Sequence, residues 1–126
     1  MNNYKDLNNV KEVIENYIKG TYEADISLLK NVFHEKARMS GYLGDKFVLG
    51  GPEPFYEDLE SHPSMKENKD NFTATITYID ITENIASATL YETGFFGDTC
   101  IEDHFHLIKL KNGEWKIISK AFSVIA

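Results

Sequence analysis

The sequence predicts an α+β fold in which a curved antiparallel sheet wraps around three N-terminal helices. Two patterns support this. Apolar residues recur every three or four positions in the first third of the chain, and the second half alternates and is rich in β-branched residues. No linker, repeat or low-complexity tract interrupts the 126 residues, so we expect one cone-shaped domain over residues 1–126. A sheet curled around helices would leave a pocket at the open end of the cone.

Three segments have helical periodicity. The first helix is expected to end at Gly20, the second to be capped by Asp25, and the third to begin at Pro52 and end near Pro63. Residues 61–71 read as a polar loop. The apolar positions of the three helices are Val10, Val13, Ile14, Tyr17 and Ile18; Ile26, Leu29, Val32 and Phe33; and Phe55, Tyr56 and Leu59.

Six segments have the composition of strands. Two are short and meet at a turn near Gly44-Asp45, and four are long. The last turn, Asn112-Gly113, is the strongest hairpin signal in the sequence. The expected short strands are residues 37–43 and 47–49, and the expected long strands are residues 72–81, 85–96, 101–111 and 114–124.

Charge and composition narrow the classes of partner. The chain has 13 basic and 20 acidic side chains and a net charge of −7, which disfavours nucleic acid and anionic membranes because both are bound mainly by Lys and Arg. Its polar start lacks the apolar region of a secretory signal, and no apolar run is long enough to span a membrane. We therefore expect a cytoplasmic protein.

No cofactor or metal is expected from the sequence. Cys100 is the single cysteine, so an internal disulfide and a cysteine-rich zinc site are excluded. His104 and His106 project from one face of a strand and follow Glu102, but no third histidine or cysteine stands at a recognisable spacing.

Strand periodicity assigns faces to the last hairpin. If Asn112-Gly113 is a two-residue turn, one face carries His104, His106, Ile108 and Leu110 opposite Ala121, Ser119, Ile117 and Trp115. The other face carries Asp103, Phe105, Leu107 and Lys109 opposite Phe122, Lys120, Ile118 and Lys116. Both faces are partly apolar, which indicates that a covering layer or a partner subunit lies on each side.

The chain resembles the nuclear transport factor 2-like superfamily and, within it, a lumazine-binding branch of small bacterial proteins. The resemblance covers nearly the whole chain and implies the α+β cone. The residues that carry it are Tyr17-Ile-Lys-Gly20, Ala24-Asp25, Phe33 to Tyr42, Pro52 to Phe55, Ile85 to Ala88, Gly94 to Gly97, Asp103 to Leu107, Gly113 to Ile117 and Ser119 to Phe122.

The resemblance also implies which face is inside. It places Asp103, Phe105, Ile118, Lys120 and Phe122 within the cone, and His104, His106, Trp115 and Ile117 on an outer face through which superfamily members often dimerise. We therefore expect a homodimer that buries this outer face.

A comparison with ketosteroid isomerase, which shares this fold, addresses chemistry. That enzyme holds its ligand with a tyrosine and a protonated aspartic acid and moves a proton with a second aspartate. The resemblance places Tyr17 and Asp103 at the two donors and Gly41 at the general base. A one-residue shift would bring Ser40 or Tyr42 to that position, and neither is a good base at neutral pH.

The function predicted from these residues is binding of a small planar or apolar molecule, such as a ring ketone or a pteridine-like dione, without catalysis. One alternative is a cofactor-free proton-transfer enzyme that uses Glu92 or Asp103, and another is a protein-interaction module that uses the outer face. The alternative to ligand contact is a salt bridge with Asp103 or Glu92 for Lys120 and a paired carboxylate for Glu92. For Asp103 it is a structural carboxylate that is hydrogen-bonded or exposed at the mouth of the pocket. The expected pocket lining is Tyr17, Phe33, Met39, Phe55, Tyr56, Leu59, Phe72, Glu92, Asp103, Phe105, Lys120 and Phe122.

Overall fold

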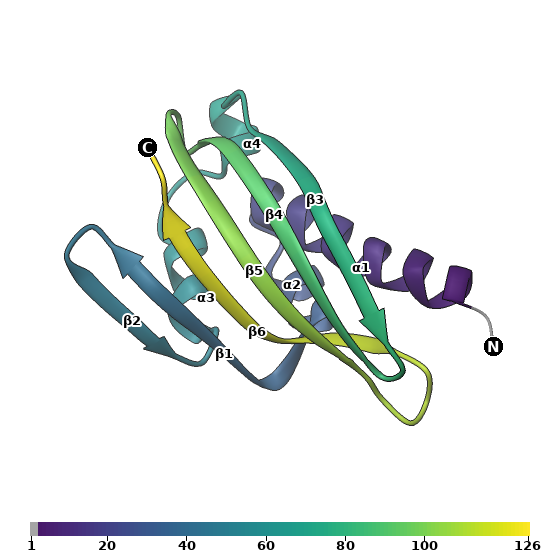
Figure 1. Ribbon diagram of the computed structural model, residues 1–126. Helices are drawn as coiled ribbons and strands as arrows, with labels where there is room; N and C mark the ends of the chain where they lie inside the picture. Colours follow the sequence, from purple (N-terminus) through teal and green to yellow (C-terminus); the bar gives the residue numbers. More distant parts are fainter. Residues whose placement is uncertain (1–2) are drawn as a thin grey trace.

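The computed structural model describes residues 3–126 and confirms the α+β class (Figure 1). The four helices are α1 (Asn3–Glu23), α2 (Ile26–Val32), α3 (Glu53–Glu60) and the single turn α4 (Met65–Asn68), which lies in the segment expected to be a loop. The six strands are β1 (Phe33–Leu43), β2 (Lys46–Gly50), β3 (Thr73–Thr82), β4 (Ile85–Phe95), β5 (Thr99–Lys109) and β6 (Trp115–Val124).

The six strands form one sheet in the order β2-β1-β6-β5-β4-β3, with α1, α2 and α3 on the same face (Figure 1). The sheet is mixed, because β1 runs parallel to β6 while the other neighbours are antiparallel. β1 is also longer than expected, so five strands are long and only β2 is short. Register shifts in four of the five strand pairs bend the strands and produce the curvature.

Gly20 does not end the first helix. α1 continues to Glu23, and Ala24 then takes a left-handed conformation while the Asp25 amide bonds back to the Gly20 carbonyl. A Cβ at residue 20 would lie 2.8 Å from a Leu29 side-chain carbon. Glycine at this position therefore lets α1 pack closely on α2, and Asp25 caps α2 as expected by accepting from the Leu28 amide.

The β5–β6 hairpin differs from the expected two-residue turn. Leu110 and Glu114 are bonded across a three-residue loop, so Trp115 pairs with Lys109 and Ile117 with Leu107. A bulge next to Ile118 then restores the expected pairing, in which Ser119 lies opposite His106 and Phe122 opposite Asp103. The outer-face assignment of Trp115 and Ile117 is therefore wrong: both are buried on the helix side of the sheet.

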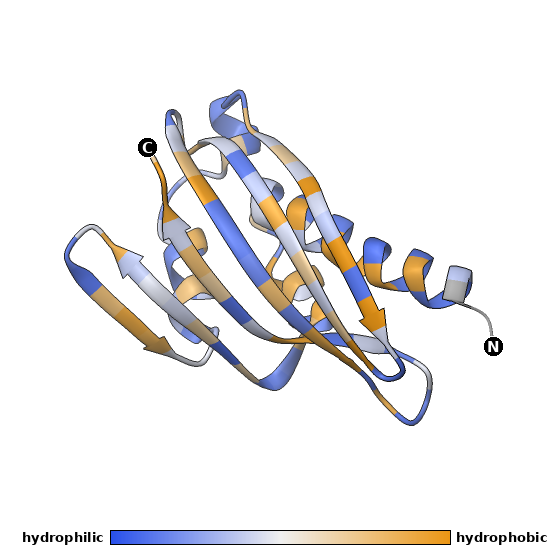
Figure 2. Ribbon diagram, in the orientation of Figure 1, coloured by the Kyte–Doolittle hydropathy of each residue, from blue (hydrophilic) through white to orange (hydrophobic). Residues whose placement is uncertain are grey.

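The core lies between the helices and the inner face of the sheet. Alternate residues of β4 and β5 point into it, which explains the alternation of hydropathy along these strands in Figure 2. Its large members include Ile14, Tyr17, Leu29, Leu90, Phe105, Leu107 and Ile117. No helix among residues 3–126 is long and apolar enough to cross a membrane.

Candidate functional site

A cavity of about 540 Å³ opens at the end of the sheet where the β1–β2 hairpin and α3 meet β4, β5 and β6. Its walls are mostly apolar and aromatic, and four of its polar residues come from separate elements: Tyr17 from α1, Glu92 from β4, Asp103 from β5 and Lys120 from β6. A hollow with apolar walls and a few convergent polar groups has the usual composition of a small-ligand site.

Two carboxyls form the floor of this cavity. Leu90 pairs with Asp103 and Glu92 with Ile101, so Glu92 and Asp103 are diagonal neighbours on the inner face of adjacent strands. Both side chains are almost completely buried, with 1% and 0% of their surface exposed. Apart from the contact between the two carboxyls and that of Asp103 with the Tyr17 hydroxyl, Glu92 Oε2 and both Asp103 oxygens make no hydrogen bond of normal geometry among the described residues.

Glu92 keeps its proton at neutral pH. Burial raises the pKa of Glu92 to about 10, and Asp103 adds to the shift both as an acceptor for the Glu92 proton and as a negative charge. Lys120 acts in the opposite direction through its positive charge. Glu92 is thus a proton donor on the cavity floor, which carboxyls at ordinary surface positions are not.

Tyr17 is a second donor at this site. Its ring is buried, and burial together with the charges of Asp103 and Glu92 raises the pKa of its phenol well above the ordinary value of 10. The rings of Phe33, Phe55 and Phe105 lie 6.0, 6.2 and 5.0 Å from that of Tyr17, centroid to centroid. This aromatic packing fixes the direction of the tyrosine side chain.

Lys120 lies across the cavity wall inside a cage of rings. Its Nζ is 4.5 Å from the centroid of Phe55, 5.1 Å from that of Tyr17 and 5.4 Å from that of Phe122. The predicted salt bridge with Asp103 or Glu92 does not form: among the described residues Lys120 makes no ion pair. Cation–π contacts with the three rings stabilise the ammonium charge instead.

A family model matches residues 5–123, nearly the whole chain, and its description is "Putative lumazine-binding". The chain belongs to this family. A search of curated proteins gives no match.

Solved structures place the family within the nuclear transport factor 2-like superfamily. One similar structure is an NTF2-like protein of unknown function from Methylobacillus flagellatus, with 27% identity, a TM-score of 0.86 and coverage of 98% of this chain and 94% of that one. Another, from Shewanella baltica, has 25% identity, a TM-score of 0.87 and coverage of 100% and 98%. A ketosteroid isomerase-like protein from Erwinia carotovora atroseptica shares the fold, with 16% identity, a TM-score of 0.71 and 98% of both chains covered.

Gly41, at the general-base position of the isomerase comparison, has no space for a side chain in this family member. It pairs with Phe122 across β1 and β6. A Cβ on Gly41 would lie 2.4 Å from the Phe122 carbonyl oxygen and 2.7 Å from its ring. Glycine at residue 41 is therefore required by the close contact between β1 and β6.

Seven of the twelve predicted lining residues border the cavity: Tyr17, Met39, Phe55, Glu92, Asp103, Lys120 and Phe122. The other five do not. Phe33 and Phe105 pack behind Tyr17, and Phe72 stacks on Tyr22. Of the three α3 residues predicted to line the cavity, only Phe55 borders it. Tyr56 and Leu59, which are three residues apart and so share a helix face, are buried in the core.

The sequence-based prediction missed the β1–β2 hairpin as a cavity wall. Lys46, Phe47 and Val48 border the cavity, as do Leu43, Gly51, Pro54, Glu57, Asp58, Ser61, Phe95 and Ile101. One signal was present: β2 is strongly hydrophobic (Figure 2), yet Phe47 is 58% exposed, which is unusual for a strand with no further role.

The outer face of the sheet retains only part of the predicted dimer surface. His104 and His106 are exposed there, and His104 Nε2 lies 2.7 Å from Glu102 Oε2. Without Trp115 and Ile117 the expected surface loses its apolar members, and homodimer formation stays a prediction. Across residues 3–126, no three His, Cys, Asp or Glu side chains are arranged to hold a metal ion.

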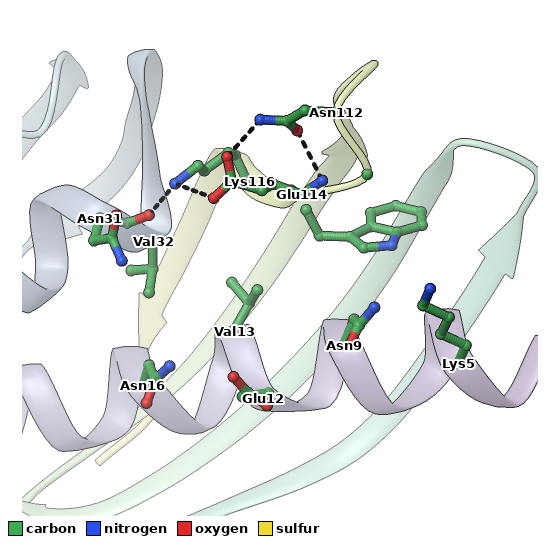
Figure 3. Close-up of a pocket in the computed structure, with 12 residues that line it drawn as sticks. Lys5, Asn9, Glu12, Val13, Asn16, Asn31, Val32, Asn112, Glu114 and Lys116 are labelled. Atoms are coloured by element: carbon green, nitrogen blue, oxygen red, sulfur yellow. Dashed lines mark hydrogen bonds and ion pairs between the residues drawn. The ribbon is translucent and has the colours of Figure 1, made fainter.

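A second hollow of about 390 Å³ lies between α1, the end of α2 and the β5–β6 loop (Figure 3). The groups on its loop side contact one another. Asn112 and Glu114 bond each other, and Lys116 contacts both Glu114 and the Asn31 carbonyl. Trp115 donates its indole N–H to Asp6, 3.2 Å away. These contacts hold the loop against α1 and α2.

Proposed function

We propose that this protein binds a small, planar, carbonyl-bearing molecule in the 540 Å³ cavity. The observation that carries the proposal is the convergence of two neutral donors, Tyr17 and protonated Glu92, with Asp103 inside aromatic walls. Donors of this kind suit a ring carbonyl, and flat aromatic walls suit a flat ring. The open cavity also favours ligand binding over a protein-interaction module, because in such a module we expect side chains to fill the cone.

A pteridine-dione is the first ligand to test, because the family description names lumazine. We expect lumazine to bind wild-type protein, with Tyr17→Phe and Asp103→Asn each weakening binding by about 1–3 kcal/mol through loss of a buried hydrogen bond. The measurement is a titration that follows lumazine fluorescence, together with native mass spectrometry of freshly purified protein to identify any bound compound.

Tyr22→Phe is the matched control. Tyr22 lies on the same helix as Tyr17 but stacks on Phe72 and does not border the cavity, so its hydroxyl should not affect affinity. Equal affinities for wild type, Tyr17→Phe and Asp103→Asn would contradict the proposed binding mode.

The carboxyl pair also favours a second candidate function, cofactor-free proton transfer. A pair of buried carboxyls that keeps a proton at neutral pH can take up or release one next to a bound carbonyl compound. Because Gly41 offers no base, any such reaction would use Glu92 or Asp103. The base would then stand at a different position in the cavity than in ketosteroid isomerase, and we therefore expect no turnover of a simple ketosteroid.

Proton exchange distinguishes the two functions. For an enzyme, we expect the protein in deuterated water to exchange the protons adjacent to the carbonyl of a small cyclic ketone at a rate that falls at least about 100-fold in Glu92→Gln. The measurement is one-dimensional NMR of the ketone. If the ketone protons exchange no faster than in buffer while lumazine binds normally, the enzyme function is contradicted and the binding function stands.

A further inference from the structure

Lys120 has no role in the binding mode proposed above, although it borders the same cavity. The side chain is only 7% exposed. It projects from the inner face of β6, where it pairs with Phe105 on one side and Met39 on the other. A lysine buried to this degree normally has a carboxylate partner.

The surroundings of Lys120 stabilise its charge without accepting its protons. Three ring faces, from α1, α3 and β6, lie within 5.4 Å of Nζ. A ring face attracts the charged ammonium and so favours that form over the neutral amine. The ammonium has three N–H donors, yet Lys120 makes no hydrogen bond or ion pair with any other described residue.

The nearby carboxyls do not take the place of an acceptor. Glu92 and Asp103 face each other, and no oxygen of either forms an ion pair with Lys120. The cavity therefore presents, on β6, a set of three ammonium N–H donors without an acceptor among the described residues, whereas the Glu92 proton is already directed at Asp103. An anionic oxygen is the group that such a set binds best.

The net charge of the whole chain further restricts the chemical class of the ligand. A net charge of −7 repels permanent anions from the protein, so a ligand that reaches the cavity as a neutral molecule has the advantage. A planar weak acid, an enol, phenol or cyclic imide, meets both conditions, because it approaches neutral and can lose its proton to solvent on binding.

From these contacts we propose that Lys120 determines ligand specificity and that the cavity selects a planar weak acid, bound as its conjugate base against the Lys120 ammonium. This inference rests on the proposed binding function and adds to it the ionisation state of the ligand.

The test uses umbelliferone, a flat fluorescent phenol with a ring carbonyl, and its methyl ether, which cannot ionise. At a pH below the pKa of the free dye, we expect wild-type protein to bind umbelliferone with the excitation spectrum of the anion. Lys120→Met should bind it as the neutral phenol, with affinity reduced about tenfold or more. Affinity for the methyl ether should stay within about threefold in both proteins.

Lys19→Met is the matched control, because Lys19 is exposed on α1 and does not border the cavity. It should keep the anion spectrum, and Lys120→Arg should keep it as well because the charge is retained. The wild-type spectrum tests the inference even if a Lys120 variant fails to fold.

Two outcomes are distinguishable. If the methyl ether binds but wild type holds umbelliferone in neutral form, or if Lys120→Met keeps the anion, the inference is overturned and the binding function stands. If neither dye nor lumazine binds, the proposed function fails and the inference fails with it.

Discussion

Raising the pH from about 5 to about 9 is expected to destabilise this protein, and Glu92→Gln is expected to remove most of the effect. Glu92 titrates near 4.5 in an unfolded chain and near 10 in the folded protein. Between these values the folded state holds a proton that the unfolded state has released. Stability from this proton is complete below about pH 4.5 and is lost as the pH approaches 10, by up to about 1.4 kcal/mol per pH unit.

Glutamine at residue 92 imitates the protonated carboxyl and cannot ionise. Glu92→Gln should therefore match wild type near pH 5 and exceed its free energy of unfolding by at least about 2 kcal/mol near pH 9. Urea unfolding followed by the emission of Trp115, the single tryptophan and a buried one, provides the measurement.

Glu102→Gln is the matched control for this prediction. Glu102 lies on β5 next to Asp103 but on the outer face, where 42% of its side chain is exposed beside His104. Its pH profile should follow that of wild type. Parallel profiles for wild type and Glu92→Gln would show that Glu92 does not hold a proton in the folded protein.

Gly41→Asp, the change that would restore a base at the isomerase position, is expected to disrupt the fold and yield no isomerase. The Cβ would meet the Phe122 carbonyl oxygen at 2.4 Å, and a backbone atom cannot move away without breaking the β1–β6 pairing. Overpacking and an additional buried carboxylate together should lower the free energy of unfolding by at least about 3 kcal/mol. Chemical denaturation measures the loss.

Gly50→Ala provides the comparison. Gly50 lies on the neighbouring strand opposite Met39, and a Cβ there would have no atom within 4 Å. Its free energy of unfolding should stay within about 0.5 kcal/mol of wild type. A stable Gly41→Asp protein with ketosteroid turnover would show that the close contact at Gly41 can relax and that only a base was missing.

The inward row of β4 is the clearest success of the sequence. Ala86, Ala88 and Leu90 alternate with polar residues, and the same period carries on to Glu92. Because side chains alternate strictly along a strand, a carboxyl at the end of an apolar row had to face the core. Counting back from Asn112-Gly113 placed Asp103, Phe105 and Lys120 on one face for the same reason, and the family resemblance identified that face as the inner one.

The same counting failed closer to the turn. Asn-Gly suits a two-residue turn, but the loop has three residues, and one added residue moves every following side chain to the opposite face. The bulge next to Ile118 cancels that shift, so Trp115 and Ile117 were misplaced while Lys120 was not. Local sequence does not encode a bulge that depends on how β6 fits against α1 and β1.

The sequence by itself determined the element types, the α+β class, the inward direction of Glu92 and the shared face of Asp103 and Lys120, because these follow from periodicity and local turn chemistry. The resemblance to the superfamily indicated that this shared face is the inner one. The tertiary structure decided which side chains contact these three residues. Lys120 could have paired with either carboxyl, and only the approach of α1 and α3 puts the rings of Tyr17 and Phe55 around its ammonium. Contacts between elements far apart in the chain depend on packing, and no local pattern in the sequence records them.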